Sequence, residues 1–377
     1  GRINALGKFP QALVGANFPE RPSNYRRYAT MAKTLAGTSP LPFAAELWMG
    51  SPPWFLPTPG DEQRNTIVSL LGNGVRAFNI MMAVNRERWH GGAIRYDGTV
   101  NEQGQWLTTL LQTLKSIEWT SLKRDIPVAL IRSNADTQFA IASSFEESLP
   151  PIASEYVLGS FADEGDVGRS LLDREDCGRT YCRWSSAIEK ALHFAQIPYE
   201  IHGPDLDGEE LRKYKAVLVP SVKRIERKLW NTLRSLRQKG KKNPRIIYGP
   251  NEPLADEFDT AYTADERKAP SGAGKLGPEA HADIKALAGD LGAALGELSA
   301  YWISPEDSNV ECAAFRQTGD VRVLVITNCE EKDKTVSIAL PRGSILVDPF
   351  TKQRIHEKNE SAPISLSASQ SRFFVVS

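Results

Sequence analysis

The sequence contains little that would tie the protein to nucleic acid or to a membrane. Lys plus Arg and Asp plus Glu number 46 each, so no charge excess marks a surface for nucleic acid or anionic lipid. No apolar run approaches the roughly 20 residues of a membrane span. No leader sequence is visible in the opening "GRINALGKFP". We therefore expect a cytoplasmic protein that binds neither nucleic acid nor a membrane.

Cysteine and histidine are also scarce. None of the four cysteines forms a CxxC pair, and none of the five histidines stands in a metal-binding spacing such as HExxH. We expect free thiols, no metal and no cofactor. Residues 272–277, "GAGKLG", match the letters GxGxxG, but a polar segment with Pro270 precedes them where a dinucleotide site needs an apolar strand. We interpret them as a flexible loop.

The composition is typical of a globular protein with two or three domains, because 41% of the 377 residues are hydrophobic and 24% are charged. Residues 1–124 hold three apolar runs, "FPQALVGANF", "LPFAAELWM" and "GVRAFNIMMAV", with helical segments between and after them. This β-α-β-α-β-α order, with nearly continuous apolar strands, predicts a parallel sheet or barrel covered by helices.

Three further regions follow. Residues 125–255 alternate strands such as "IPVALIRS" and "YKAVLVPSV" with helices, which predicts an open, doubly wound α/β sheet. Residues 256–300 are polar and rich in Gly, Pro and Ala, and we interpret them as a linker followed by a helix. Residues 301–377 alternate short strands with turns and predict a small β-sandwich.

Glu46 is the one carboxylate in the apolar and aromatic stretch "LPFAAELWMGSPPW", residues 41–54. A charge at the end of a buried strand is costly unless it is paired or used. In barrels, catalytic groups project from the carboxyl ends of the strands. Aromatic rings beside a carboxylate suit carbohydrate chemistry, because sugar faces stack on such rings. A structural glutamate paired with an arginine is the alternative.

The next apolar run leads into a second group of polar and aromatic residues. It reads "AFNIMMAVNRERWHGGAIRYDGTVNEQG", and its glycines allow a ligand to approach the backbone closely. An ordinary turn-rich loop would have a similar composition, so this segment alone leaves both interpretations open.

Together the two stretches resemble the family 35 glycoside hydrolases of clan A. "AELWMG" matches that family's TE-[FYW]-W-x-G motif at the end of barrel strand seven, where the Glu is the nucleophile. "FNIMMAVNRERWHGG" and "YDGTVNEQG" resemble its later FN-x-YM-x-x-GG and YD-x-x-x-x-E-x-G segments. The resemblance covers residues 1–105. It implies that the nucleophile is Glu46 and that the sugar is bound by Trp48, Trp54, Asn79, Trp89, His90 and Tyr96.

The rest of the chain resembles the family 42 arrangement. In that arrangement the barrel is followed by a flavodoxin-like, amidotransferase-like trimerisation domain and a small β domain. The combination is similar to the archaeal exo-β-glucosaminidases. It implies a retaining, exo-acting β-galactosidase or exo-β-D-glucosaminidase that acts on a carbohydrate substrate and forms a homo-oligomer.

The resemblance also implies that part of the active site lies elsewhere. A complete (β/α)₈ barrel takes about 250 residues, so we expect residues 1–124 to hold only barrel strands six to eight. Retaining hydrolysis needs a second carboxyl group about 5 Å from the nucleophile, and the family places this acid/base after strand four. We therefore expect a missing N-terminal barrel half, as a separate chain or a removed segment, to supply it.

Two other functions are compatible with the sequence. The chain is alternatively a non-catalytic sugar-binding or assembly subunit with an incomplete barrel. The middle region is alternatively a true amidotransferase, which would need Cys177 or Cys182 as nucleophile on a tight turn between a strand and a helix.

Overall fold

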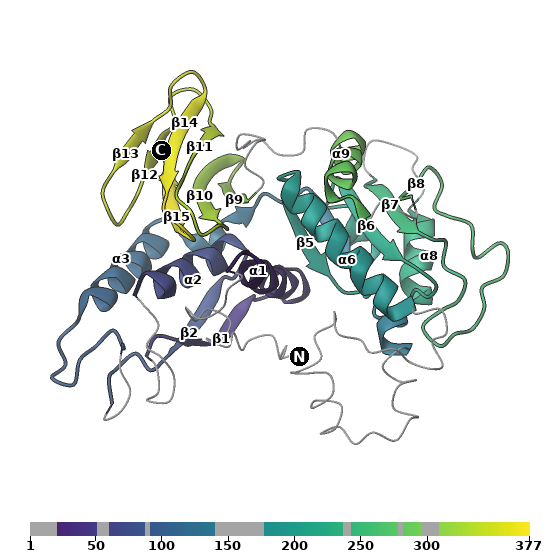
Figure 1. Ribbon diagram of the computed structural model, residues 1–377, viewed down its shortest axis with the longest axis horizontal. Helices are drawn as coiled ribbons and strands as arrows, with labels where there is room; N and C mark the ends of the chain where they lie inside the picture. The colour runs from purple at the N-terminus through teal and green to yellow at the C-terminus, as the bar shows by residue number, and fades with distance from the viewer. Residues whose placement is uncertain are drawn as a thin grey trace. The chain divides into compact units, whose positions relative to one another are not determined.

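The computed structural model describes residues 21–50, 60–86, 91–139, 177–236, 243–277, 282–295 and 309–377, and for residues 21–24, 27 and 48 the backbone alone. The chain divides into two compact units (Figure 1). The first unit combines Gly1–Asp125 with Ser299–Ser377, and the second unit is Ile126–Leu298. None of the described helices is long and apolar enough to cross a membrane.

Helices alternate with parallel strands in the N-terminal part of the first unit. Its elements are α1 (Arg21–Thr38), β1 (Phe43–Trp48), α2 (Gly60–Gly72), β2 (Ala77–Met81), α3 (Glu102–Ser116), η3 (Trp119–Ser121) and β3 (Lys123–Arg124). Strands β1 and β2 pair in parallel, as the apolar runs predict. Within the described residues their sheet has two strands and is not closed. The "FPQALVGANF" run lies outside the described residues.

The C-terminal part of the first unit is all β. Its strands are β9 (Val310–Gln317), β10 (Asp320–Asn328), β11 (Lys334–Ala339), β12 (Ile345–Val347), β13 (Arg354–His356), β14 (Ser361–Leu366) and β15 (Ser371–Val376). Six strands form one sheet in the order β13-β12-β15-β10-β9-β3, and β11 pairs with β14 in a second. Leu324 and Ile326 of the large sheet share a core with Val336 and Ile338 of the small one, as in a sandwich.

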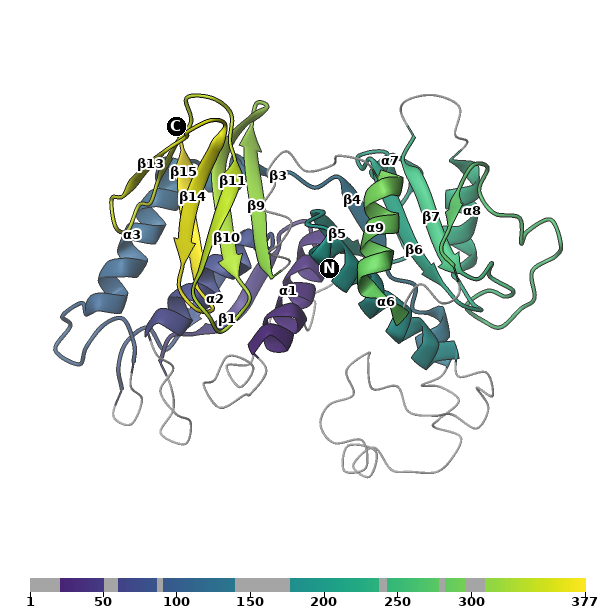
Figure 2. The ribbon, with the colours of Figure 1, turned by 45° about the horizontal axis from the view of Figure 1, so that its top comes forward.

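The other face of the large sheet is also buried. Val323 and Val325, which alternate with Leu324 along β10, belong to the core that includes Leu71 of α2. Figures 1 and 2 show α2 lying against this sheet. Residues 1–124 and 301–377, which the sequence suggests as separate domains, therefore share one hydrophobic core. The sequence of β10 is apolar on both faces, which indicates that both are buried. It does not indicate which segment of the chain covers the second face.

The second unit is a doubly wound α/β fold. Its elements are β4 (Val128–Ile131), α6 (Cys177–Phe194), β5 (Tyr199–His202), α7 (Gly208–Leu211), β6 (Ala216–Ser221), α8 (Arg227–Ser235), β7 (Arg245–Pro250), β8 (Gly274–Lys275) and α9 (Ile284–Leu295). The strands are parallel in the order β5-β4-β6-β7-β8, which is the flavodoxin-like order. Helices α6 and α9 pack on one face and α8 on the other (Figure 1).

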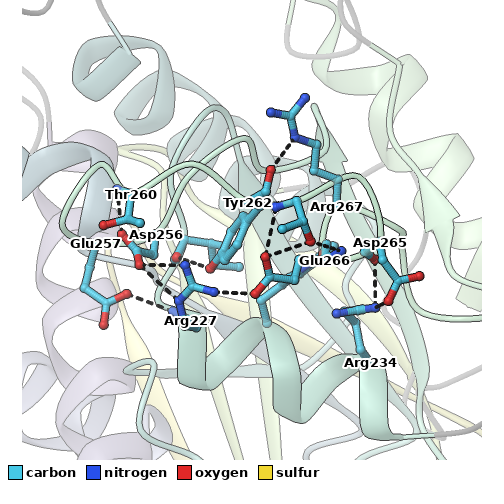
Figure 3. A network of polar contacts seen from close by, with 12 residues as sticks. Arg227, Arg234, Asp256, Glu257, Thr260, Tyr262, Asp265, Glu266 and Arg267 are labelled. Carbon is cyan, nitrogen blue, oxygen red and sulfur yellow. Dashed lines mark hydrogen bonds and ion pairs between the residues drawn. The ribbon is translucent and has the colours of Figure 1, made fainter.

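Much of the segment expected to be a linker is an ordered part of the second unit. Residues 251–268 pack on α8 through a polar network (Figure 3). Arg227 forms ion pairs with Asp256, at 3.0 Å, and with Glu266. The indole N–H of Trp230 donates to the Glu266 carbonyl at 2.7 Å. Residues 274 and 275, in the "GAGKLG" segment interpreted as a flexible loop, form β8 and pair with β7. Paired charges therefore accompany the buried ring of Tyr262 in joining this segment to the second unit.

Candidate active site

Glu46, in the first unit, lies at a β-bulge in strand β1. Ala44 pairs with Phe78 and Leu47 pairs with Ile80, so Ala45 and Glu46 together stand opposite Asn79. One extra residue therefore lies in β1. Such bulges are rare between parallel strands, and they often redirect a side chain beside a functional site.

The bulge keeps Glu46 out of the hydrophobic core. In a regular strand, side chains alternate between faces, so Glu46 would share the face of Ala44 while Leu47 pointed the opposite way. Instead Ala44 and Leu47, three residues apart, both lie in the core beneath the helices. Ala45 is exposed and Glu46 is half-buried. A half-buried position at the open face retains access to solvent or a ligand, which a core carboxylate lacks.

Asn79 lies on the same open face. Its neighbours Phe78 and Ile80 pack against the core, whereas Asn79 is exposed. The Asn79 Nδ2 donates a hydrogen bond to the Ala45 carbonyl at 3.3 Å. The structure thus brings together two of the residues predicted from the sequence: Glu46, in the C-terminal half of β1, and Asn79, at the middle of β2.

The chain beyond both strands is held by further hydrogen bonds. The Met49 N–H donates to the Met81 carbonyl at 3.0 Å, which extends the pairing past β1. The buried Gln63 side chain of α2 donates to the Met49 carbonyl. Met82 follows with a φ of 59°, so the chain turns sharply out of β2. The backbone around Glu46 is therefore fixed from the adjacent strand and from α2.

The loop after β2 is built around Gly92. The Gly92 N–H donates to Asn85 Oδ1 at 2.8 Å, and Asn101 Nδ2 donates to the Gly92 carbonyl at 2.6 Å. A Cβ at this position would lie 2.9 Å from the Met82 carbonyl oxygen. Asn101 also caps α3 by accepting from the Gly104 N–H. The close packing explains the second glycine of the "HGG" sequence without a ligand.

Tyr96 lies on a tight turn of the same loop. It is 60% exposed. The Gly98 N–H donates to the Arg95 carbonyl at 3.0 Å, and the Arg95 N–H donates to the Thr99 carbonyl at 2.8 Å. Hydrogen bonds from the hydroxyl and N–H of Thr99 lower the pKa of Asp97 below its ordinary value. Tyr96 is therefore held on an ordered turn from which its ring is accessible.

The remaining predicted site residues lie outside the described part of the chain. They are the side chain of Trp48 and the whole of Trp54, Trp89 and His90. Sequence reasoning missed Gln63 and Asn101, whose amide side chains bond to the backbone around the strand ends. Asn85 belongs to the polar group that the sequence places after the second strand. An amide in the same segment as the glycine pair was the available signal for Asn101. Nothing local in the sequence marks Gln63.

Metal-binding, thiol and further carboxylate groups can be located among the described residues. Among the described residues, no group of three or more His, Cys, Asp and Glu side chains could hold a metal ion. Cys177 and Cys182 lie in the first two turns of α6, where Cys177 is buried and Cys182 is half-buried. Glu102, in the first turn of α3, forms an exposed ion pair with Arg64 at 2.6 Å.

Comparison with known proteins shows similarity of fold. No protein-family model and no curated protein matches the sequence. Gan42B, a GH42 β-galactosidase from G. stearothermophilus, is 12% identical with a TM-score of 0.63 over 96% of this chain and 57% of its own. The β-galactosidase from Bacillus circulans sp. alkalophilus is 12% identical, with a TM-score of 0.61 over 98% and 59%. The rhamnosidase from Novosphingobium sp. PP1Y is 11% identical, with a TM-score of 0.51 over 94% and 32%.

These neighbours share the α/β fold with mixed sheets. The chain spans less than two thirds of their length. At such low identity the similarity shows a shared fold only. The chemistry has to be argued from the residues of the site.

Proposed function

We propose that the chain is part of a retaining, exo-acting β-glycosidase with Glu46 as its nucleophile. One observation carries the proposal. A β-bulge turns Glu46 onto the open face near the carboxyl end of a parallel strand, in a fold similar to GH42 β-galactosidases. Catalytic carboxylates of barrel enzymes stand in this position.

In the proposed mechanism, Glu46 attacks the anomeric carbon and forms a covalent glycosyl-enzyme, which water then hydrolyses. A second carboxyl group protonates the leaving oxygen and later activates the water. We place that acid/base outside this chain, on the N-terminal half of the barrel. The support for this placement is the sequence resemblance, which puts the acid/base after barrel strand four.

We propose a β-galactoside as the substrate, because the first two neighbours named above are β-galactosidases. An exo-β-D-glucosaminide is the competing substrate, supported by the sequence resemblance alone. The two differ in the group at the 2-position, a hydroxyl or an amine, and in the configuration at the 4-position, so kcat/KM for matched β-galactosides and β-glucosaminides distinguishes them.

The test is Glu46→Gln in the assembled enzyme, with Glu102→Gln as the matched control from the same unit. We expect Glu46→Gln to lower kcat/KM by more than about a thousandfold, because a nucleophile contributes far more than a binding contact. Glu102→Gln should change it by less than about threefold, since Glu102 is in an exposed pair. A loss below about tenfold for Glu46→Gln would exclude Glu46 as the nucleophile.

Covalent trapping gives a second measurement. A 2-deoxy-2-fluoro β-galactoside with a good leaving group should label Glu46, and peptide mass mapping should locate the label within residues 43–48. An assembled protein that binds galactosides but never becomes labelled would instead be a non-catalytic sugar-binding subunit.

A further inference from the structure

We infer that Asn79 is a positioning residue for Glu46 rather than a contact for the sugar. The inference rests on the proposed function of Glu46. It assigns to the Asn79 amide the task of holding the bulged backbone from which the nucleophile projects.

At the bulge, the regular pairing between the backbones of β1 and β2 is interrupted. Parallel pairing is regular up to Ala44 and Phe78 and resumes at Leu47 and Ile80. The extra residue of a bulge falls outside the ladder. The hydrogen bond from Asn79 Nδ2 to the Ala45 carbonyl, at 3.3 Å, lies at this gap. It ties the peptide group just before Glu46 to the neighbouring strand.

The position of Asn79 suits this task. A side chain on the open face at this register lies opposite both Ala45 and Glu46. Its amide can donate to the Ala45 carbonyl, whereas an aspartate would place a second acceptor and a second negative charge there. A shorter side chain such as serine would carry its hydroxyl closer to the Asn79 backbone, away from the bulge.

Fixing the peptide before the nucleophile affects rate more than binding. A carboxylate attacks efficiently only when its oxygen is held near the anomeric carbon along the correct line, and displacements of about 1 Å are costly. A residue that contacts the sugar equally in the ground and transition states changes KM instead. The two roles therefore predict different kinetics.

The experiment compares Asn79→Ala, Asn79→Asp and Asn85→Ala. Asn85 supplies the matched control for backbone order, because its amide also bonds to the backbone, but at Gly92 in the loop after β2. In substrate-free protein, hydrogen exchange of the peptide covering residues 43–49 should accelerate about threefold to tenfold in both Asn79 variants, the range that losing one hydrogen bond produces. It should stay unchanged in Asn85→Ala.

The kinetic measurement uses the assembled enzyme. Asn79→Ala should lower kcat and the rate of labelling by the fluoroglycoside about tenfold, with KM within about twofold. Asn79→Asp should additionally move the acidic limb of the pH profile of kcat/KM to higher pH, because a neighbouring negative charge raises the pKa of a carboxyl. An unshifted limb would mean that side chain 79 does not face Glu46, which would overturn the placement on which the inference rests.

The outcomes separate the inference from the proposed function. If Glu46→Gln abolishes activity but Asn79→Ala raises KM with kcat and hydrogen exchange unchanged, Asn79 contacts the sugar and the inference is wrong. If Glu46→Gln retains activity, the proposed function fails. Faster exchange around Glu46 in Asn79→Ala would then support only the backbone part of the inference.

Discussion

Lys33 and Glu311 form an ion pair with 2.5 Å between Nζ and Oε1, although 278 residues separate them in the sequence. Lys33 lies on α1 and is 2% exposed, and Glu311 lies on β9. The Tyr25 hydroxyl donates to the other carboxylate oxygen at 2.7 Å. This pair joins the N-terminal and C-terminal parts of the first unit at a buried position, beside the hydrophobic core that they share.

Lys33→Ala should therefore destabilise the first unit by about 3–5 kcal/mol, because it removes the positive charge from beside a largely buried carboxylate. Urea denaturation measures the effect. Glu102→Gln, which removes a pair whose carboxylate is 82% exposed, should cost less than about 1 kcal/mol. Equal small losses in the two variants would show that the buried pair does not hold the two parts together.

Asp136, in the second unit, should make the free energy of unfolding depend on pH. Its carboxylate accepts hydrogen bonds from the N–H groups of Lys223 and Arg224, both at 3.1 Å. Burial raises the pKa of Asp136 to about 6, although these bonds and the Arg224 charge oppose the rise. In the unfolded chain the same carboxyl loses its proton near its ordinary pKa of 3.8. Between those values the folded state binds more protons, so the free energy of unfolding falls as pH rises.

Asp136→Asn tests this sign. The stability of the wild type minus that of the variant should decrease by up to about 3 kcal/mol between pH 4 and pH 7. Burial also raises the pKa of Glu226, but that contribution is common to both proteins and cancels in the difference. Denaturation curves at four pH values suffice. A difference that grows with pH would mean that the pairing with Arg224 outweighs the cost of burial.

The polar network on α8 should protect the segment that it binds from proteolysis. Asp256 is buried and accepts from the N–H groups of Phe258 and Thr260 and from Arg227. Asp256→Ala should release the segment that Figure 3 shows on α8 and expose it to trypsin at Arg267 and Lys268.

Asp265→Ala is the matched control, because Asp265 is 76% exposed in its pairs with Arg234 and Lys268. Its effect on stability should stay within about 0.5 kcal/mol. Cleavage rates that are equal in the two variants would indicate that the apolar contacts of Tyr262, and not the buried carboxylate, hold the segment.

Gly92→Ala should disrupt the loop that follows β2. The added Cβ would meet three oxygen atoms at 2.9–3.0 Å, two of them backbone carbonyls that have little room to move. We expect a loss of about 1–3 kcal/mol in local stability, seen as faster hydrogen exchange across residues 82–101. Gly289→Ala in α9 meets no atom within 4 Å, so it should be neutral or stabilising. Unchanged exchange in Gly92→Ala would mean that the loop relaxes without cost.

Local sequence patterns were sufficient to predict whether most of the described segments form helices or strands. Apolar runs predicted parallel sheets, and β1 pairs in parallel with β2, as β4 does with β6. For β4 and β6 the runs are continuous because strands buried on both faces need apolar residues at every position. The same signals singled out Glu46, since a lone carboxylate in an apolar strand needs a reason. They failed for residues 251–268, because ion pairs formed with a distant helix leave no periodic pattern in the sequence.

The sequence by itself determined which residue carries the unusual charge and that it belongs to a parallel strand. Only the tertiary structure decided where that charge points and what fixes it. An insertion of one residue relative to a neighbouring strand reverses the face of every later side chain, and it is visible only once both strands are paired. For the same reason, the interpretation of Asn79 changes from sugar contact to backbone support, because the Ala45 carbonyl that it binds is 34 residues away in the chain.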